Sequence, residues 1–143
     1  MGTILCDKAK EYDVRFLWEN VHWCVYQQPN FAHRLLEYCD HPNLGFTLDN
    51  KQAMISGYTV DAYIEDMGSR LSNVHICDYY KNKEGYYLTC LPGTGDLDLA
   101  HLKSSLQEAG YDGQATLEVY SSNYQTYAEL SNCFAMIKRW ATE

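Results

Sequence analysis

The 143-residue chain has no long apolar run, no C-x-x-C pair and no excess of positive charge. Without a run of about 20 apolar residues, we expect neither a membrane-spanning helix nor a membrane partner. None of the six cysteines is spaced as in a zinc ribbon or redox motif, and the first residues lack the apolar core of a signal peptide. These absences predict a cytoplasmic, reduced protein.

The charge balance argues against nucleic acid as a partner. Eleven lysines and arginines stand against 19 aspartates and glutamates, which gives a formal net charge of −8. An acidic surface repels phosphate backbones, so we expect no nucleic-acid binding. The chain is nevertheless 46% hydrophobic and 14% aromatic, which excludes disorder as a description of the whole and fits one domain over residues 1–143.

Segments of strand composition alternate along the chain with segments of helical periodicity. The expected strands lie at about residues 14–20, 43–49, 71–78 and 115–121. Apolar residues at helical spacing predict helices over residues 31–39, 59–67, 98–109 and 126–140. Such alternation indicates parallel strands joined by right-handed crossovers. Residues 79–97, which are rich in glycine, are expected to form one long irregular stretch.

The two faces of the expected strands differ in character. One parity is apolar throughout and contains Phe16, Trp18, Leu44, Phe46, Leu48, Val74, Ile76, Leu117 and Val119. The opposite parity mixes polar, charged and small residues. Since side chains alternate between the faces of a strand, the apolar face must meet the helices. An open doubly wound sheet would be apolar on both faces, so this pattern favours the wall of a barrel.

Each expected strand places one potential metal ligand near its carboxyl end, on the mixed face. These residues are Glu19, Asp49, His75 and Glu118. Parallel α/β folds build their active sites at this end of the strands. Three carboxylates and one imidazole suit one divalent metal, with Mn²⁺ preferred and Mg²⁺, Co²⁺ or Zn²⁺ as alternatives. Two local alternatives stay open: Asp49 as a helix N-cap, and His75 as a hydrogen-bonded core histidine.

The order of short motifs resembles the C-terminal half of the xylose-isomerase-like TIM barrels. The motifs are LWENV, FTLDNKQA, NVHICD, LPGTGDLD and ATLEVYS, and they cover nearly the whole chain. This superfamily includes sugar isomerases, ketose 3-epimerases and endonuclease IV. The resemblance implies an α/β fold of four βα units, equivalent to the C-terminal half of a (β/α)8 TIM barrel with parallel strands. It also implies that Glu19, Asp49, His75 and Glu118 bind one divalent metal.

The implied activity is that of a divalent-metal-dependent sugar isomerase or epimerase. The resemblance implies proton transfer through an enediolate on a ketose or related polyol, with Glu19 and Glu118 as the catalytic base and acid. Further substrate contacts are expected from His22, Gln52, Asp78 and Tyr120. Endonuclease IV needs additional histidines, and this chain has Gln52 three residues after Asp49 and no D-x-H after Asp78. We therefore do not expect cleavage of DNA at abasic sites.

The length of the chain leads to an expectation about partners. A complete (β/α)8 barrel needs about 250 residues, so this sequence has enough for four units. A half-barrel exposes two strand edges and its inner face, which water or another chain must satisfy. We expect a small carbohydrate as the substrate. We also expect the chain to form a homodimer or to associate with a complementary chain that carries the N-terminal half. The alternative to an enzyme is a non-catalytic metal-binding or structural half-barrel, either a remnant or a fragment of a longer enzyme.

Overall fold

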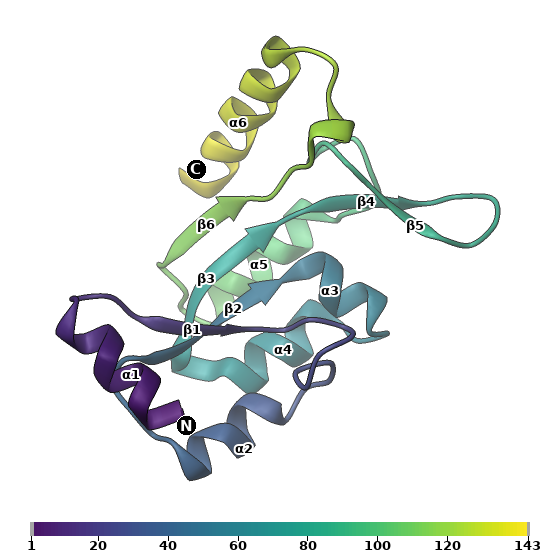
Figure 1. Cartoon of the computed structure of the whole chain (residues 1–143). Helices are drawn as coiled ribbons and strands as arrows, with labels where there is room; N and C mark the ends of the chain where they lie inside the picture. Colours follow the sequence, from purple (N-terminus) through teal and green to yellow (C-terminus); the bar gives the residue numbers. More distant parts are fainter. Residues whose placement is uncertain (1, 143) are drawn as a thin grey trace.

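The computed structural model describes residues 2–142 and is built on one parallel sheet (Figure 1). Its four strands run in the order β1-β2-β3-β6, and each pairs in parallel with its neighbours. The strands are β1 (Phe16–Glu19), β2 (Leu44–Asp49), β3 (Leu71–Ile76) and β6 (Gln114–Leu117). The predicted α/β class with parallel strands is confirmed.

Helices precede, connect and follow these strands. They are α1 (Gly2–Glu11), α2 (Phe31–Tyr38), α3 (Asn50–Ile55), α4 (Val60–Met67), α5 (Leu99–Glu108) and α6 (Tyr127–Thr142), with short 3-10 turns η1 (Gly68–Arg70) and η2 (Ser121–Asn123). In Figure 1, α1 lies near β1 at one end of the sheet, and α6 lies beyond β6 at the other. Within residues 2–142, none of the helices is long and apolar enough to cross a membrane.

Much of the apolar parity of the strands lies in the main core, as the alternation predicts, while Phe16 and Leu44 pack in a second, smaller cluster. Phe46 and Ile76 are fully buried and belong to one cluster with Tyr63 of α4 and Leu102 of α5. At about 25 cal/mol per Å² of apolar surface removed from water, this layer is the chief source of stability. Because alternate residues point to opposite faces of a strand, packing this parity against the helices directs the other parity away from them.

The stretch after β3 differs from the single irregular segment that we predicted. Strand β4 (Asp78–Lys81) pairs antiparallel with β5 (Tyr87–Cys90) and forms a hairpin that projects from the sheet (Figure 1). At its tip, the Asn82 Oδ1 accepts hydrogen bonds from the backbone N–H groups of Glu84 and Tyr86, and Gly85 adopts a φ of 89°. The hairpin is mostly solvent-facing, so it lacks the apolar alternation by which buried strands are recognised.

One buried carboxylate holds the return from this hairpin in place. The fully buried Asp78 accepts backbone hydrogen bonds from Tyr79, Gly93, Gly95 and Leu97, at 2.7, 2.9, 2.9 and 3.0 Å. Gly93 has a φ of 90°, and a Cβ at Gly95 would collide with the Tyr79 carbonyl and with Asp78 itself. The two glycines of LPGTGDLD therefore let the backbone wrap closely around this carboxylate.

Replacing Asp78 with alanine should destabilise the fold strongly. The Asp78→Ala variant leaves four part-buried N–H groups without their acceptor. An unsatisfied group costs about 1–3 kcal/mol when it is fully buried. We expect the free energy of unfolding, measured by urea denaturation, to fall by at least about 3 kcal/mol. The matched control is Asp112→Ala, which removes an exposed carboxylate. Equal stability of the two variants would contradict this role for Asp78.

Candidate metal centre

The four predicted ligands come together at the carboxyl edge of the sheet. Glu19, Asp49, His75 and Glu118 each offer one ligand atom, and these atoms all lie within 4.8 Å of one another. Asp49 and His75 are register partners across β2 and β3. Glu118 immediately follows β6, and its backbone N–H continues the ladder by donating to Ile76 at 3.0 Å. The parallel register therefore brings the ends of all four strands to one point.

His75 lies between the two glutamates. Its Nδ1 is 3.1 Å from the Glu19 Oε1 and 3.3 Å from the Glu118 Oε2. Hydrogen bonds to Glu118 and Glu19 raise the pKa of His75 to about 10. In turn, the bond from His75 holds the pKa of Glu118 down at about 2. The metal-free centre is thus bridged by an imidazolium at neutral pH.

Asp49 combines the two roles that the sequence left open. Its Oδ1 accepts a hydrogen bond from the Gln52 backbone N–H at 2.9 Å, so it is the N-cap of α3 as well as a member of the cluster. The buried amide of Asn20 pairs with the Asp49 backbone through two hydrogen bonds, of 2.7 and 3.0 Å. Burial raises the pKa of Asp49 to about 7. His75 is likewise no isolated core histidine, because its contacts are the cluster glutamates.

Two residues of the centre went unpredicted, namely Asn20 and Lys51. The Lys51 ammonium is buried, donates to the Tyr120 hydroxyl at 3.1 Å and lies 3.8 Å from the Glu118 Oε1. The Tyr120 hydroxyl donates to the same Glu118 oxygen at 2.6 Å. The sequence did offer a signal for both, because Asn20 directly follows Glu19 and Lys51 stands two residues after Asp49. Lys51 adds a second positive charge beside the carboxylates.

The donor set fits a divalent cation. Donor atoms bound to one ion at about 2.0–2.3 Å can be at most about 4.6 Å apart. The four donor atoms all lie within 4.8 Å of one another, which is close to this limit, so they are near enough to share one ion. Oxygen donors with a single nitrogen suit Mn²⁺, Mg²⁺, Co²⁺ or Zn²⁺.

The predicted substrate contacts fall into two groups. The His22 Nδ1 and the Gln52 Oε1 lie 2.6 Å apart beside Asp49, and Tyr120 bonds to Glu118 with 43% of its surface exposed. Tyr120 therefore borders the centre, and His22 is joined to it through Gln52, whose backbone N–H bonds to the Asp49 carboxylate. Asp78 does not, because its carboxylate is fully buried and accepts the four loop bonds described above. Direct contact between Asp78 and a substrate therefore does not fit its position, and this residue supports the loop instead.

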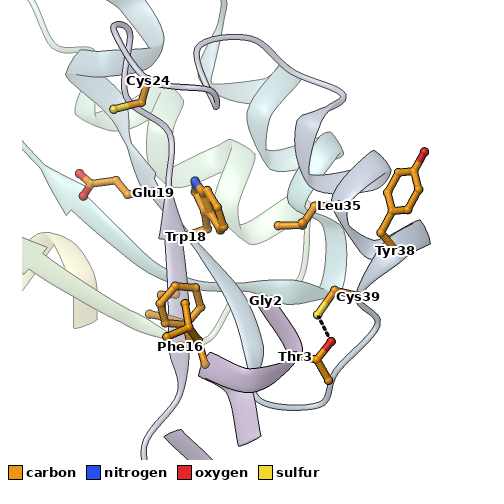
Figure 2. A pocket seen from close by; sticks show the side chains of 11 residues that line it. Gly2, Thr3, Phe16, Trp18, Glu19, Cys24, Leu35, Tyr38 and Cys39 are labelled. Atoms are coloured by element: carbon orange, nitrogen blue, oxygen red, sulfur yellow. Dashed lines mark hydrogen bonds between the residues drawn. The ribbon is translucent and has the colours of Figure 1, made fainter. Parts of the chain in front are cut away.

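An apolar cavity of about 520 Å³ lies beside β1, and of the four clustered residues only Glu19 lines it (Figure 2). Residues of α1, α2 and β1 line it, including Leu5, Phe16, Trp18 and Leu35. Figure 2 shows that the side chains of Glu19 and Trp18 leave β1 on opposite sides. The cavity offers few groups for acid–base chemistry, so we place the candidate site at the four clustered ligands.

Fold and site together define a parallel α/β protein with a candidate metal centre at the carboxyl ends of its strands. The chain belongs to the xylose isomerase-like TIM barrel family, whose sequence model matches residues 3–137. This membership confirms the resemblance seen in the sequence motifs. No curated protein gives a significant match.

Several solved structures share the fold. The chain is similar to IolI protein with a bound zinc atom, with a TM-score of 0.74 and 23% identity, covering 96% of this chain and 51% of that one. It is similar to 3-keto-D-glucoside 4-epimerase from E. coli, with a TM-score of 0.73, 18% identity and coverages of 95% and 50%. It is also similar to D-allulose 3-epimerase from Methylomonas sp. in complex with D-allulose. That match has a TM-score of 0.67 and 24% identity, and it covers 92% of this chain and 43% of that one. The chain thus spans about half the length of these structures.

Metal binding should tighten as the pH rises. An incoming ion must displace the proton of His75, whose pKa is about 10, and below about pH 7 also that of Asp49. We expect one Mn²⁺ per chain, with an affinity that rises about tenfold per pH unit between about pH 7 and 10 and more steeply below pH 7. Calorimetric titration in buffers of different ionisation enthalpy measures both the affinity and the protons released.

Asp49→Ala is the variant that tests the assignment, because it removes a charged ligand while leaving the other three. We expect its Mn²⁺ affinity to fall by a factor of about 100 or more, by analogy with loss of a supporting ligand contact. Asp112→Ala serves as the control and should bind like the unmodified protein. Equal metal occupancy in both variants would remove Asp49 from the ligand set. An affinity that does not change with pH would remove His75.

Proposed function

We propose that this protein is a divalent-metal-dependent sugar isomerase or epimerase that acts on a ketose or related polyol within a completed barrel. The observation that carries the proposal is the cluster of three carboxylates and one imidazole at the strand ends. Family membership supports it, as do similar structures described as 3-keto-D-glucoside 4-epimerase and D-allulose 3-epimerase. A bound divalent ion, with Mn²⁺ preferred, would polarise the substrate carbonyl and acidify the adjacent C–H group.

Glu19 and Glu118 are the proposed acid–base pair. They come from β1 and β6, the first and last strands of the described sheet, and both reach the central His75. Carboxylates approaching from two flanks can remove a proton from one face of a substrate carbon and return it to the other. The lowered pKa of Glu118 keeps it ionised at neutral pH, as a base requires. Asp49 and His75 complete the centre and hold the glutamates in place.

A non-catalytic half-barrel is the second candidate. The observation that favours it is the open sheet of residues 2–142, in which β1 pairs with β2 alone and β6 with β3 alone. In this case the chain would bind metal or serve a structural role, as a remnant or as part of a longer enzyme. Substrate turnover, rather than metal binding, separates the two candidates, because all four proposed ligands lie in this chain.

The proposed exchange is a proton at the carbon next to a ketose carbonyl. Metal-loaded protein incubated with a panel of ketoses in deuterated water should place deuterium at that carbon, as read by NMR. The Glu118→Gln variant lacks a carboxylate base, and we expect its exchange to fall by a factor of about 100 or more. The control is Glu108→Gln, which alters an exposed glutamate on α5.

The outcome separates catalysis from mere binding. Exchange retained in Glu108→Gln and lost in Glu118→Gln supports the proposed pair. If no ketose exchanges a proton while metal is bound and the quaternary structure is intact, the non-catalytic candidate replaces the enzyme.

We also propose that further strands complete the sheet at β1 and β6, from a second copy or a complementary chain. Among residues 2–142, β1 pairs with β2 alone and β6 with β3 alone. Apolar side chains are exposed on the helices near both edges, with Ile4 72% exposed on α1 and Phe134 58% exposed on α6. Burial of such surface on association is favourable. The apolar cavity beside β1 lies on one of these edges.

Light scattering tests this association. At micromolar concentration, the purified 143-residue chain should scatter as a dimer or a larger assembly. A double variant, Ile4→Lys with Phe134→Lys, places charges on both helices and should shift the distribution toward smaller species. A well-folded monomer at these concentrations would show that the exposed edges need no partner strands.

A further inference from the structure

The loop after β1 is tied to the start of α3 by two successive pairs of hydrogen bonds. In the first pair, the buried Asn20 amide clasps the Asp49 backbone, with bonds of 2.7 and 3.0 Å. In the second, the Gln52 Oε1 lies 3.2 Å from the His22 backbone N and 2.6 Å from the His22 Nδ1. Gln52 is itself bonded to the Asp49 carboxylate through its backbone N–H. The His22 ring is therefore fixed relative to the metal centre.

The hydrogen-bond chemistry determines which ring nitrogen of His22 carries the proton. A backbone N–H can only donate, so the Gln52 atom that faces it must be the carbonyl oxygen. A carbonyl oxygen can only accept, so the Nδ1 at 2.6 Å must also donate. In the neutral imidazole, Nε2 is then the unprotonated nitrogen with a free lone pair. Within the part of the chain that the structure describes, no group hydrogen-bonds to this Nε2.

We propose that the His22 Nε2 accepts a hydrogen bond from a hydroxyl group of the substrate at the metal centre, and that Gln52 is the positioning residue that sets this tautomer. The proposal rests on the proposed sugar isomerase or epimerase function. Polyols and ketoses are rich in hydroxyl donors, whereas the glutamates and Asp49 of the centre are committed to the ion and to the reacting carbon. An oriented acceptor three residues after Glu19 would select substrates with a hydroxyl at the matching position.

The chain contains its own reference for this tautomer assignment. At His41, the backbone N–H of Asn43 donates to Nδ1 at 3.0 Å, while Nε2 lies 3.2 Å from the Asp7 carboxylate. By the same reasoning, His41 carries its proton on Nε2, the opposite of His22. Long-range ¹H–¹⁵N spectra of the labelled protein distinguish the two forms directly. We expect Nδ1–H at His22 and Nε2–H at His41, and Nε2–H at His22 would overturn the proposal.

Variants at Gln52 separate positioning from general structural support. Gln52→Ala removes the acceptor, so His22 should lose its single tautomer and give averaged nitrogen shifts, while His41 keeps its own. Gln52→Glu retains an acceptor oxygen and should restore Nδ1–H at His22. A His22 tautomer unchanged in Gln52→Ala would show that Gln52 does not set it.

Substrate contact is tested by NMR with D-allulose as the probe ligand. Mg²⁺ is used as the metal because it is diamagnetic. Adding D-allulose to the metal-loaded protein should shift the His22 Nε2 resonance and leave that of His41 in place. His22→Asn keeps a donor toward Gln52 but removes Nε2, so its affinity for D-allulose should fall about tenfold, the effect of about one hydrogen bond.

The D-allulose binding experiment distinguishes failure of the His22 role from failure of the proposed function. If D-allulose binds the unmodified protein and His22→Asn equally well, the role of His22 is wrong and the proposed function stands. If D-allulose and the other ketoses of the exchange panel fail to bind the metal-loaded protein, both the proposed function and the role of His22 are wrong.

Discussion

Three carboxylates gathered in a space of a few ångströms repel one another, and the centre exists because positive charge lies between and beside them. His75 supplies this charge from the middle of the sheet, where its neighbours raise its pKa to about 10. Lys51 supplies a second cation from the first turn of α3, in contact with the Tyr120–Glu118 pair. A bound divalent ion would take over the first role and leave the second unchanged. The protein can therefore fold with its ligands already assembled.

This assembled centre depends on how firmly the strand ends are held. Asn20 and Gln52 join the exits of β1 and β2, while the backbone of Glu118 stays paired with β3. The carboxylates consequently sit on regular strands or directly after them, where side-chain direction is set by the backbone and not by a mobile loop. Such preorganisation keeps charged groups in place without reorganising water during a reaction.

The cluster of candidate metal ligands was predictable from sequence because strand alternation and parallel register follow from backbone geometry alone. Lys51 and Asn20 escaped prediction because their roles depend on contacts across strands and helices, to Tyr120 and to the Asp49 backbone. Asp78 shows the limit most clearly: it has the residue type and strand-end position of a ligand, yet four N–H donors of the following loop enclose it. The hairpin of β4 and β5 escaped because exposed strands carry no apolar alternation.

The attachment of that hairpin has a consequence for protein engineering. The chain leaves β3 at Asp78, forms the hairpin and returns to the same carboxylate through Gly93 and Gly95. Entry and exit are thus pinned to one point, while the tip around residues 82–85 lies in solvent. A reporter peptide or a longer loop grafted at the tip would lengthen the hairpin while the His75 strand keeps its anchor. The hairpin is therefore an attachment site at which a label can be displayed without rebuilding the candidate metal centre.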